Sequence, residues 1–266
     1  MKIYILTDLE GVNGVVHPDQ TDIIGPGYEK AREWLTLEVN AAVQGAVDGG
    51  ATEVLVVDGH GMNNACNMVY DKLHKAATYI QGSPWSEYLQ SLDSSFDGMF
   101  QIGAHAMAGT PAAVLEHTMS AASWVEMRLN GKPTGEIGLI AAIAGQFGVP
   151  FVMVSGDDKA CAESAALVPD VECAVVKRGI SRHCADMLSM NDAHALIREK
   201  ARQSMRKLKI IKPVVVDSPV EIEVFYLRTH EVDAIIEREG VRKIDSRKVV
   251  YTGKNVIEAF DHVRGK

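Results

Sequence analysis

The segment at residues 2–7, KIYILT, is followed directly by the acidic, glycine-bearing segment DLEGVNG at residues 8–14. The first segment is apolar and β-branched along nearly its whole length, which predicts a buried strand. The second contains the glycines and acids that commonly end a strand. The sequence therefore predicts a strand that delivers two carboxylates, Asp8 and Glu10, into a loop.

Two later segments repeat this arrangement, and each delivers a histidine. Residues 52–58, TEVLVVD, lead into a glycine-bearing loop with His60, and residues 98–103, GMFQIG, lead to His105. Apolar residues at helical spacing over residues 28–47 predict a helix between the first two strands. Strands that alternate with helices and are almost entirely apolar are typical of a parallel sheet covered on both faces.

The middle of the chain continues this alternation. Residues 123–129, SWVEMRL, predict the first strand of a hairpin that turns at Asn130 and Gly131. Thr134 is expected to cap a helix over residues 135–144. Further strands are expected at residues 151–155, 171–176 and 247–253, and further helices at residues 157–167, before residue 208, and at residues 231–239.

These elements predict an α/β fold, with a mostly parallel sheet and helices on both faces. Beyond about residue 209 the sequence becomes strand-rich and charged, as in KPVVVDSPVEIEVFYL at residues 212–227. We therefore expect an α/β domain over residues 1–209, which contains every candidate site residue, and a smaller α+β portion over residues 210–266.

Composition narrows the class of partner. The formal net charge of −8 argues against binding to nucleic acid or anionic lipid, since both require a basic face. The sequence contains neither a signal-peptide pattern nor an apolar run long enough to span a membrane, so we expect a cytoplasmic protein. The four cysteines lack CxxC spacing and are expected to be reduced. Dinucleotide-binding, P-loop and serine-hydrolase motifs are absent from the sequence.

Five polar residues are candidates for a metal site. In an open α/β sheet, ligands bind outside the carboxyl ends of the strands, where Asp8, His60 and His105 are predicted to lie. Glu10 projects to the same side as Asp8 if the chain stays extended, because alternate residues share a face. Glu136 joins them if its helix starts at the same edge, where the helix dipole favours a carboxylate. Alternatively, such acids and histidines cap helices or face water.

Three carboxylates and two imidazoles exceed the three protein ligands of a single catalytic zinc, so they suit two ions with one bridging carboxylate. Paired metals can polarise a carbonyl group and activate water at neutral pH. This chemistry serves aminopeptidases and phosphatases alike. The ligand pattern therefore leaves the substrate open.

Other polar residues are candidates for further roles. His117 is the candidate nucleophile or general base, against the alternative of a structural histidine. Lys177 and Arg182 could bind a substrate carboxylate or simply be exposed cations. Asp157 and Asp158 follow a predicted strand and open a predicted helix, so we interpret them as a helix cap.

The chain resembles the zinc-dependent D-aminopeptidases of the DppA type, metallopeptidase family M55. The resemblance extends from residue 1 to about residue 185, includes KRGISR at residues 177–182, and is weaker beyond. It rests on segments that occur in the family's order: DLEGVNG (8–14), VDGHGMNN (57–64), GAHAMAGTPAAVLEHTMS (103–120), GEIGLIAAIAG (135–145) and VMVSGDDKA (152–160).

The resemblance implies two zinc ions per subunit, with Asp8 as the bridging ligand and His117 as the residue proposed as nucleophile. The other implied zinc ligands are Glu10, His60, His105 and Glu136. It also implies release of N-terminal D-amino acids from short peptides such as D-Ala-D-Ala, and a homo-oligomer in the form of a ring-shaped decamer. Two alternatives stay open: another dinuclear-metal hydrolase, acting on phosphate esters or non-peptide amides, and a non-catalytic peptide-binding assembly.

Overall fold

The computed structural model describes residues 1–61 and 66–266, and its larger sheet has seven strands in the order β3-β2-β1-β4-β7-β8-β9. All neighbouring strands are parallel except β8 and β9. Residues 62–64 of the VDGHGMNN motif lie outside the described residues. The strands are β1 (Lys2–Thr7), β2 (Glu53–Asp58), β3 (Thr78–Ile80), β4 (Gly98–Ala104), β7 (Phe151–Asp157), β8 (Glu172–Ser181) and β9 (Cys184–Met187).

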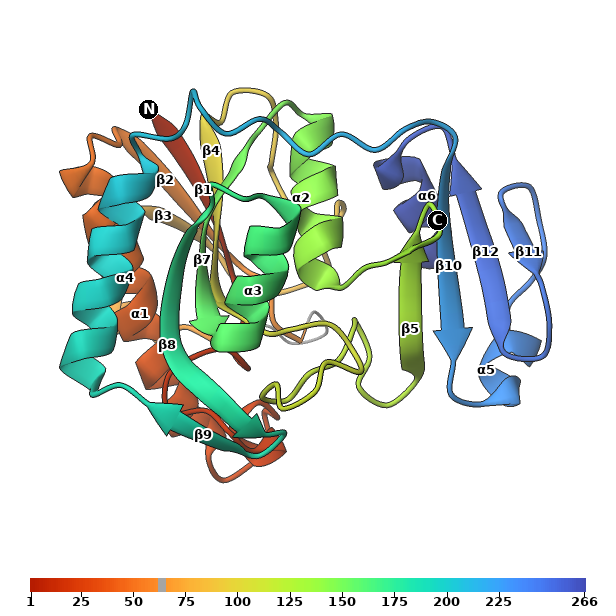
Figure 1. Cartoon of the computed structure of the whole chain (residues 1–266), viewed down its shortest axis with the longest axis horizontal. Coiled ribbons are helices and arrows are strands. Elements are labelled where there is room, and N and C mark those ends of the chain that lie inside the picture. Colours follow the sequence, from red (N-terminus) through yellow and green to blue (C-terminus); the bar gives the residue numbers. More distant parts are fainter. Residues whose placement is uncertain (62–65) are drawn as a thin grey trace.

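Helices cover both faces of this sheet, as the sequence predicts (Figure 1). α1 and α4 pack against each other on one face, and α2 and α3 lie on the other. The helices are α1 (Tyr28–Asp48), α2 (Glu136–Gln146), α3 (Asp158–Leu167) and α4 (Met190–Ser204), and short 3-10 helices occupy Pro18–Gln20 (η1) and Tyr70–Lys72 (η2). No helix of the described residues is both long and apolar enough to cross a bilayer.

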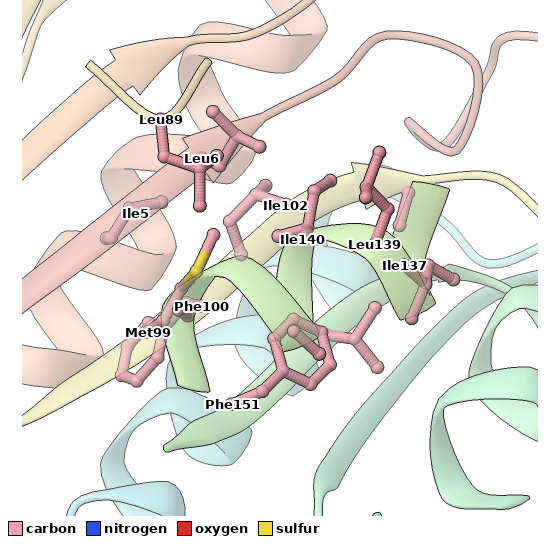
Figure 2. Close-up of a cluster of buried hydrophobic side chains, with 14 of the residues drawn as sticks. Ile5, Leu6, Leu89, Met99, Phe100, Ile102, Ile137, Leu139, Ile140 and Phe151 are labelled. Carbon is pink, nitrogen blue, oxygen red and sulfur yellow. The ribbon is translucent and has the colours of Figure 1, made fainter. Parts of the chain in front are cut away.

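Helix α2 is apolar around nearly its whole circumference because it is covered on several sides. It packs against β4 and β7, against α3, and against the C-terminal helix α6 (Val256–Val263). Figure 2 shows its side chains, including Ile137 and Ile140, gathered against β4 at Ile102. Burial of each such side chain contributes about 1.5–3 kcal/mol. This packing fixes the start of α2, at Glu136, relative to the sheet.

A second sheet has five strands in the order β11-β12-β10-β5-β6 and is antiparallel. Its strands are β5 (Trp124–Leu129), β6 (Lys132–Pro133), β10 (Val220–Tyr226), β11 (Val241–Lys243) and β12 (Lys248–Gly253), and α5 spans Thr229–Asp233. α6 packs on β10 and β12 and connects this sheet to α2. β5 and β6 thus join strands from the C-terminal part of the chain, and the division of the chain near residue 210 stays a prediction.

Most of the predicted elements are confirmed, and two details are wrong. The hairpin turns at Asn130 and Gly131, both with positive φ. Gly135, not Thr134, is the N-cap of α2, because the Thr134 hydroxyl donates to the carbonyl oxygen of Lys132 instead. The helix expected at residues 231–239 is only the short α5, since the chain turns back there to form β11.

The ends of β1 and β4 approach each other closely because glycine lies on both sides of the contact. Gly103 has a φ of 79°, and a Cβ atom there would lie 2.1 Å from the carbonyl oxygen of Asp8. A Cβ atom at Gly11 would lie 2.0 Å from the carbonyl oxygen of Ala104. The Gly11 N–H donates to the carbonyl oxygen of Gly103 at 2.7 Å. These contacts hold the loop after β1 beside His105.

We expect Gly103→Ala to lower the free energy of unfolding by about 3–5 kcal/mol, because the methyl group adds a backbone collision to left-handed strain. Gly109→Ala is the matched control: its φ is 81°, but its Cβ would meet nothing within 4 Å. Strain alone should cost it about 1–2 kcal/mol. Chemical denaturation measures both variants, and equal losses would contradict the close contact.

Candidate metal centre

Three adjacent strands carry candidate site residues at their carboxyl ends. β2, β1 and β4 are parallel neighbours, so their ends meet at one edge of the sheet, the lower edge in Figure 1. Asp8 directly follows β1, His60 comes shortly after β2, and His105 directly follows β4. The strand order therefore places Asp8 between two histidines.

Asp8, Glu10 and His60 form one compact group. His60 Nδ1 lies 3.0 Å from Asp8 Oδ1 and 3.1 Å from Glu10 Oε2. One ring nitrogen can donate to only one of these oxygens, and Glu10 Oε2 is buried without a hydrogen-bond partner among the described residues. An unpaired buried oxygen is costly. It is therefore well placed to bind a cation.

His105, His117 and Glu136 form a second group. Glu136 Oε1 lies 3.2 Å from His105 Nε2 and 3.7 Å from His117 Nε2, and the two imidazole rings stack with centroids 4.0 Å apart. Asp8 lies between the groups, because its Oδ2 is 3.4 Å from His105 Nε2 while its Oδ1 faces His60. Each oxygen of one carboxylate thus faces a different group.

All three histidines are oriented in the same way: one ring nitrogen faces a backbone carbonyl and the other faces the carboxylates. A carbonyl oxygen only accepts, so the nitrogen facing it carries the proton and, in the neutral ring, leaves the other as a ligand atom. Metal-binding histidines are typically held by such a bond. The bonds run from His60 Nε2 to Thr21 (2.8 Å), from His105 Nδ1 to Ala106 (3.0 Å) and from His117 Nδ1 to Leu115 (2.9 Å).

The site is buried and its charges are strongly coupled. Burial and the negative charge of Glu10 raise the pKa of Asp8 to about 7. Burial opposes ionisation of Glu10, but the charge of His60 holds the pKa of Glu10 well below its usual range. Burial likewise opposes charging of His105, but Glu136 and Asp8 raise its pKa well above the ordinary value. In the metal-free protein, the positive charge of protonated imidazoles thus balances the negative charge of the carboxylates. Divalent cations can supply this positive charge instead.

The pKa of His117 is shifted in the opposite direction. Burial, together with the positive charge of His105, lowers the pKa of the His117 imidazole.

The donor set fits two divalent cations. Within each group of three residues, the ligand atoms lie within 4.8 Å of one another. Three nitrogen and oxygen ligands with one open position are typical of catalytic zinc. An open pocket of about 380 Å³ adjoins the first group and is lined by Thr21, Asp22, Ile23, Tyr28, His60, Gly61 and Asn67.

The loop that carries His117 is held in a strained conformation. Leu115 and Met119, two residues to either side of His117, have φ values of 52° and 59°. The N–H of Met119 donates to Glu136 Oε1 at 2.7 Å, and the N–H of Leu115 donates to the carbonyl oxygen of Arg182 at 3.0 Å. Strain of this kind persists only where the surroundings fix the backbone. The geometry around His117 is therefore set by contacts with α2 and with the turn after β8.

Asp157 is confirmed as the cap of α3 and also contacts the His117 loop. Its Oδ1 accepts the N–H groups of Lys159 and Ala160, and its Oδ2 accepts that of Val114 at 2.7 Å.

The structure contradicts a substrate-binding role for Lys177, whereas a role for Arg182 stays a prediction. Lys177 is 1% exposed, and its Nζ donates to backbone carbonyl oxygens. Burial lowers the pKa of Lys177 to about 8, although nearby carboxylates, Glu38 first among them, favour its charged form. Arg182 donates to the carbonyl oxygen and the carboxylate of Glu116. Lys177 is therefore not available to a substrate carboxylate, whereas the Arg182 side chain is 40% exposed and binds Glu116 through Nη1 alone.

All six residues singled out by sequence converge on this site: Asp8, Glu10, His60, His105, His117 and Glu136. Their functional roles stay predictions, and His117 lies where either a ligand or a base could act. The sequence analysis missed Thr21, because a backbone acceptor leaves no signature in side-chain patterns. It also missed Glu163, whose Oε2 accepts the Met107 N–H at 2.8 Å beside α2.

Comparison with known proteins gives matches over nearly the whole chain. The sequence model of peptidase family M55, described as D-aminopeptidase, matches residues 1–264. A D-aminopeptidase of Bacillus subtilis (strain 168) is 34% identical over 265 residues, covering 98% of this chain and 94% of the relative. The solved structure of the Zn-dependent D-aminopeptidase DppA from Bacillus subtilis, described as a self-compartmentalizing protease, matches with a TM-score of 0.94 and 31% identity. The match covers 100% of this chain and 96% of that one.

Proposed function

The chain belongs to the D-aminopeptidase family, peptidase family M55, and from that membership we propose that it is a zinc-dependent aminopeptidase that releases N-terminal D-amino acids from short peptides. The observation that carries the proposal is the pair of adjacent ligand groups, with Asp8 of the first group also facing His105 of the second. The zinc dependence of the matched structure supports the choice of metal.

We assign one zinc ion to Asp8, Glu10 and His60 and a second to Asp8, His105 and Glu136. Two observations support this assignment: the two Asp8 oxygens point to different groups, and Glu10 Oε2 has no hydrogen-bond partner among the described residues. When bound, a zinc pair supplies Lewis-acid polarisation of the scissile carbonyl and stabilises the negative charge that develops on its oxygen.

His117 is assigned as the catalytic residue. Its Nδ1–H bond to the Leu115 carbonyl leaves Nε2 facing the site, 3.7 Å from Glu136 Oε1. From there Nε2 either attacks the scissile carbonyl or takes the proton from an attacking water and passes it to the leaving amine. The strained loop fixes the direction of this lone pair. A carboxylate of the site is the natural partner for the ammonium group of the substrate.

A phosphatase with the same ligands is the main alternative, and the arrangement of cations argues against it. A phosphate ester carries charge that basic side chains commonly bind. Lys177 is buried and donates to backbone carbonyl oxygens, and the charge of Arg182 is paired with that of Glu116. A neutral peptide carbonyl needs no such cation.

The assay that tests the proposal compares three substrates of the zinc-loaded protein: D-Ala-D-Ala, L-Ala-L-Ala and a generic phosphate ester. We expect release of D-alanine, a much lower rate with the L-dipeptide, and loss of activity when a chelator removes the metal. Phosphate release without peptide cleavage would overturn the proposal.

Asp8→Asn should lose both zinc ions, because the bridging carboxylate serves each group. Glu10→Gln is the comparison variant and should lose only one, since its carboxylate faces only the His60 group. Elemental analysis gives the ratio of metal to chain. Two ions retained by Asp8→Asn would contradict the bridging role.

His117→Ala should keep both ions and lose hydrolysis by a factor on the order of 10²–10⁴, the usual contribution of a general acid or base. His183→Ala is the control, because His183 is an exposed histidine that contacts the Val16 carbonyl. Unchanged turnover in His117→Ala would show that His117 takes no part in hydrolysis. Loss of one ion would make it a ligand instead.

We also propose that the chain forms a homo-oligomer, a ring-shaped decamer. The description of the matched structure as self-compartmentalizing supports an assembly. Light scattering should then give a mass about ten times the 28.9 kDa of the chain. A monomer at micromolar concentration would contradict the proposal.

A further inference from the structure

A buried lysine on β8 holds the loop that carries the carboxylates of the first ligand group. Lys177 is 1% exposed and extends from β8 to the loop that follows β1. Its Nζ donates to the carbonyl oxygens of Glu10, Val12 and Val15, at 2.6, 2.9 and 2.5 Å. An ammonium group has three N–H donors, so these bonds satisfy it completely.

The bonds matter because turn contacts within the loop satisfy only some of its carbonyl groups, such as that of Leu9, which accepts the Val12 N–H at 3.2 Å. Residues 9–16 belong to neither a helix nor a strand, and buried backbone groups without a partner are unfavourable. β8 is separated from β1 by β4 and β7 in the sheet. Lys177 therefore connects β8 with the loop that follows β1, a strand with which β8 does not pair.

Other contacts hold the rest of the loop. The N–H of Asp8 donates to the carbonyl oxygen of Ile102 at 2.8 Å, and the N–H of Asn13 donates to Glu38 Oε1 at 2.8 Å. Between these points, the Glu10–Gly11 peptide group is held from both sides: the Gly11 N–H donates to the carbonyl oxygen of Gly103 at 2.7 Å, and the Glu10 carbonyl oxygen accepts from Lys177. That carbonyl lies one bond from the Cα atom that carries the Glu10 side chain. Its direction thus helps to set where the Glu10 carboxylate points.

We infer that Lys177 is a positioning residue: it fixes the backbone of residues 10–15 and thereby sets the affinity of the Asp8, Glu10 and His60 group for its cation. It touches neither substrate nor metal. The inference rests on the proposed function for one point, the identity of the cation as zinc. Removal of a residue that orients a ligand typically weakens metal binding 10–100-fold.

The first experiment compares Lys177→Met with the matched control Lys200→Met. Lys200, on α4, lies 2.8 Å from Glu172 Oε2 at the opposite end of β8. Competition of each metal-free variant with a chromogenic chelator for zinc gives the two affinities. Lys177→Met should weaken one ion 10–100-fold and leave the other unchanged, and Lys200→Met should change neither. Two unchanged affinities, or two equally weakened ones, in Lys177→Met would overturn the inference.

A double variant tests whether the effect acts through the Glu10 group. Glu10→Ala should retain one zinc ion, and adding Lys177→Met to it should leave the affinity for that ion unchanged. A further loss of affinity would show that Lys177 acts elsewhere and would overturn the inference.

Hydrogen exchange of the metal-free protein tests, independently of zinc, whether Lys177 fixes the backbone of residues 10–15. In Lys177→Met the amides of residues 9–16 should exchange at least about tenfold faster, with residues 105–120 unchanged, as expected for local opening. No change, or an equal rise in both segments, would overturn the inference. If the wild type neither binds zinc nor cleaves D-Ala-D-Ala, the proposed function fails while this result still stands.

Should Lys177→Met fail to fold, Lys177→Arg replaces it in the exchange measurement. Arginine keeps the charge and the N–H donors but cannot reproduce the lysine geometry. A faster exchange confined to residues 9–16 supports the inference, and any other pattern overturns it.

Discussion

The close contact between the ends of β1 and β4 is the constraint on which the rest of the site depends. The backbone at Gly103 lies so near the carbonyl oxygen of Asp8 that no side chain fits between them. With β2 on the other side of β1, this contact places Asp8 between His60 and His105. A sheet of the same strands with ends that splayed apart would carry the same residues without a common site.

Bringing the Asp8, Glu10 and Glu136 carboxylates together is energetically unfavourable without a cation. The three carboxylates are largely buried and close to one another, and burying charge is unfavourable unless it is paired. Backbone N–H groups provide part of the compensation: that of Leu9 donates to Asp8, and that of Met119 donates to Glu136. The imidazoles provide the remainder while they carry protons. The fold therefore brings together side chains that fit divalent cations, and the matched D-aminopeptidase structure is Zn-dependent.

The need to pair buried polar groups also explains Lys177 and Arg182, for which the sequence left open substrate binding or simple exposure. Lys177 and Arg182 lie near the strand end where a substrate could bind, so their charge suggested recognition of a carboxylate. In the structure both bind the protein itself: Lys177 binds the loop after β1, and Arg182 binds Glu116 next to His117. Irregular loops have many unpaired carbonyl groups. A long cationic side chain is one of the few groups that can satisfy several of them at once.

The sequence by itself determined the α/β class, most of the strand and helix positions and the identity of the six converging residues. Apolar periodicity marks strands and helices locally, and the rule that sites lie beyond strand ends selects polar residues without coordinates. Only the tertiary structure decided that β5 pairs with β10, that Asp8 faces both ligand groups, and that Lys177 is buried. Each of these depends on contacts between residues far apart in the chain, such as Lys177 and Glu10. A local sequence pattern does not predict which distant groups will come into contact.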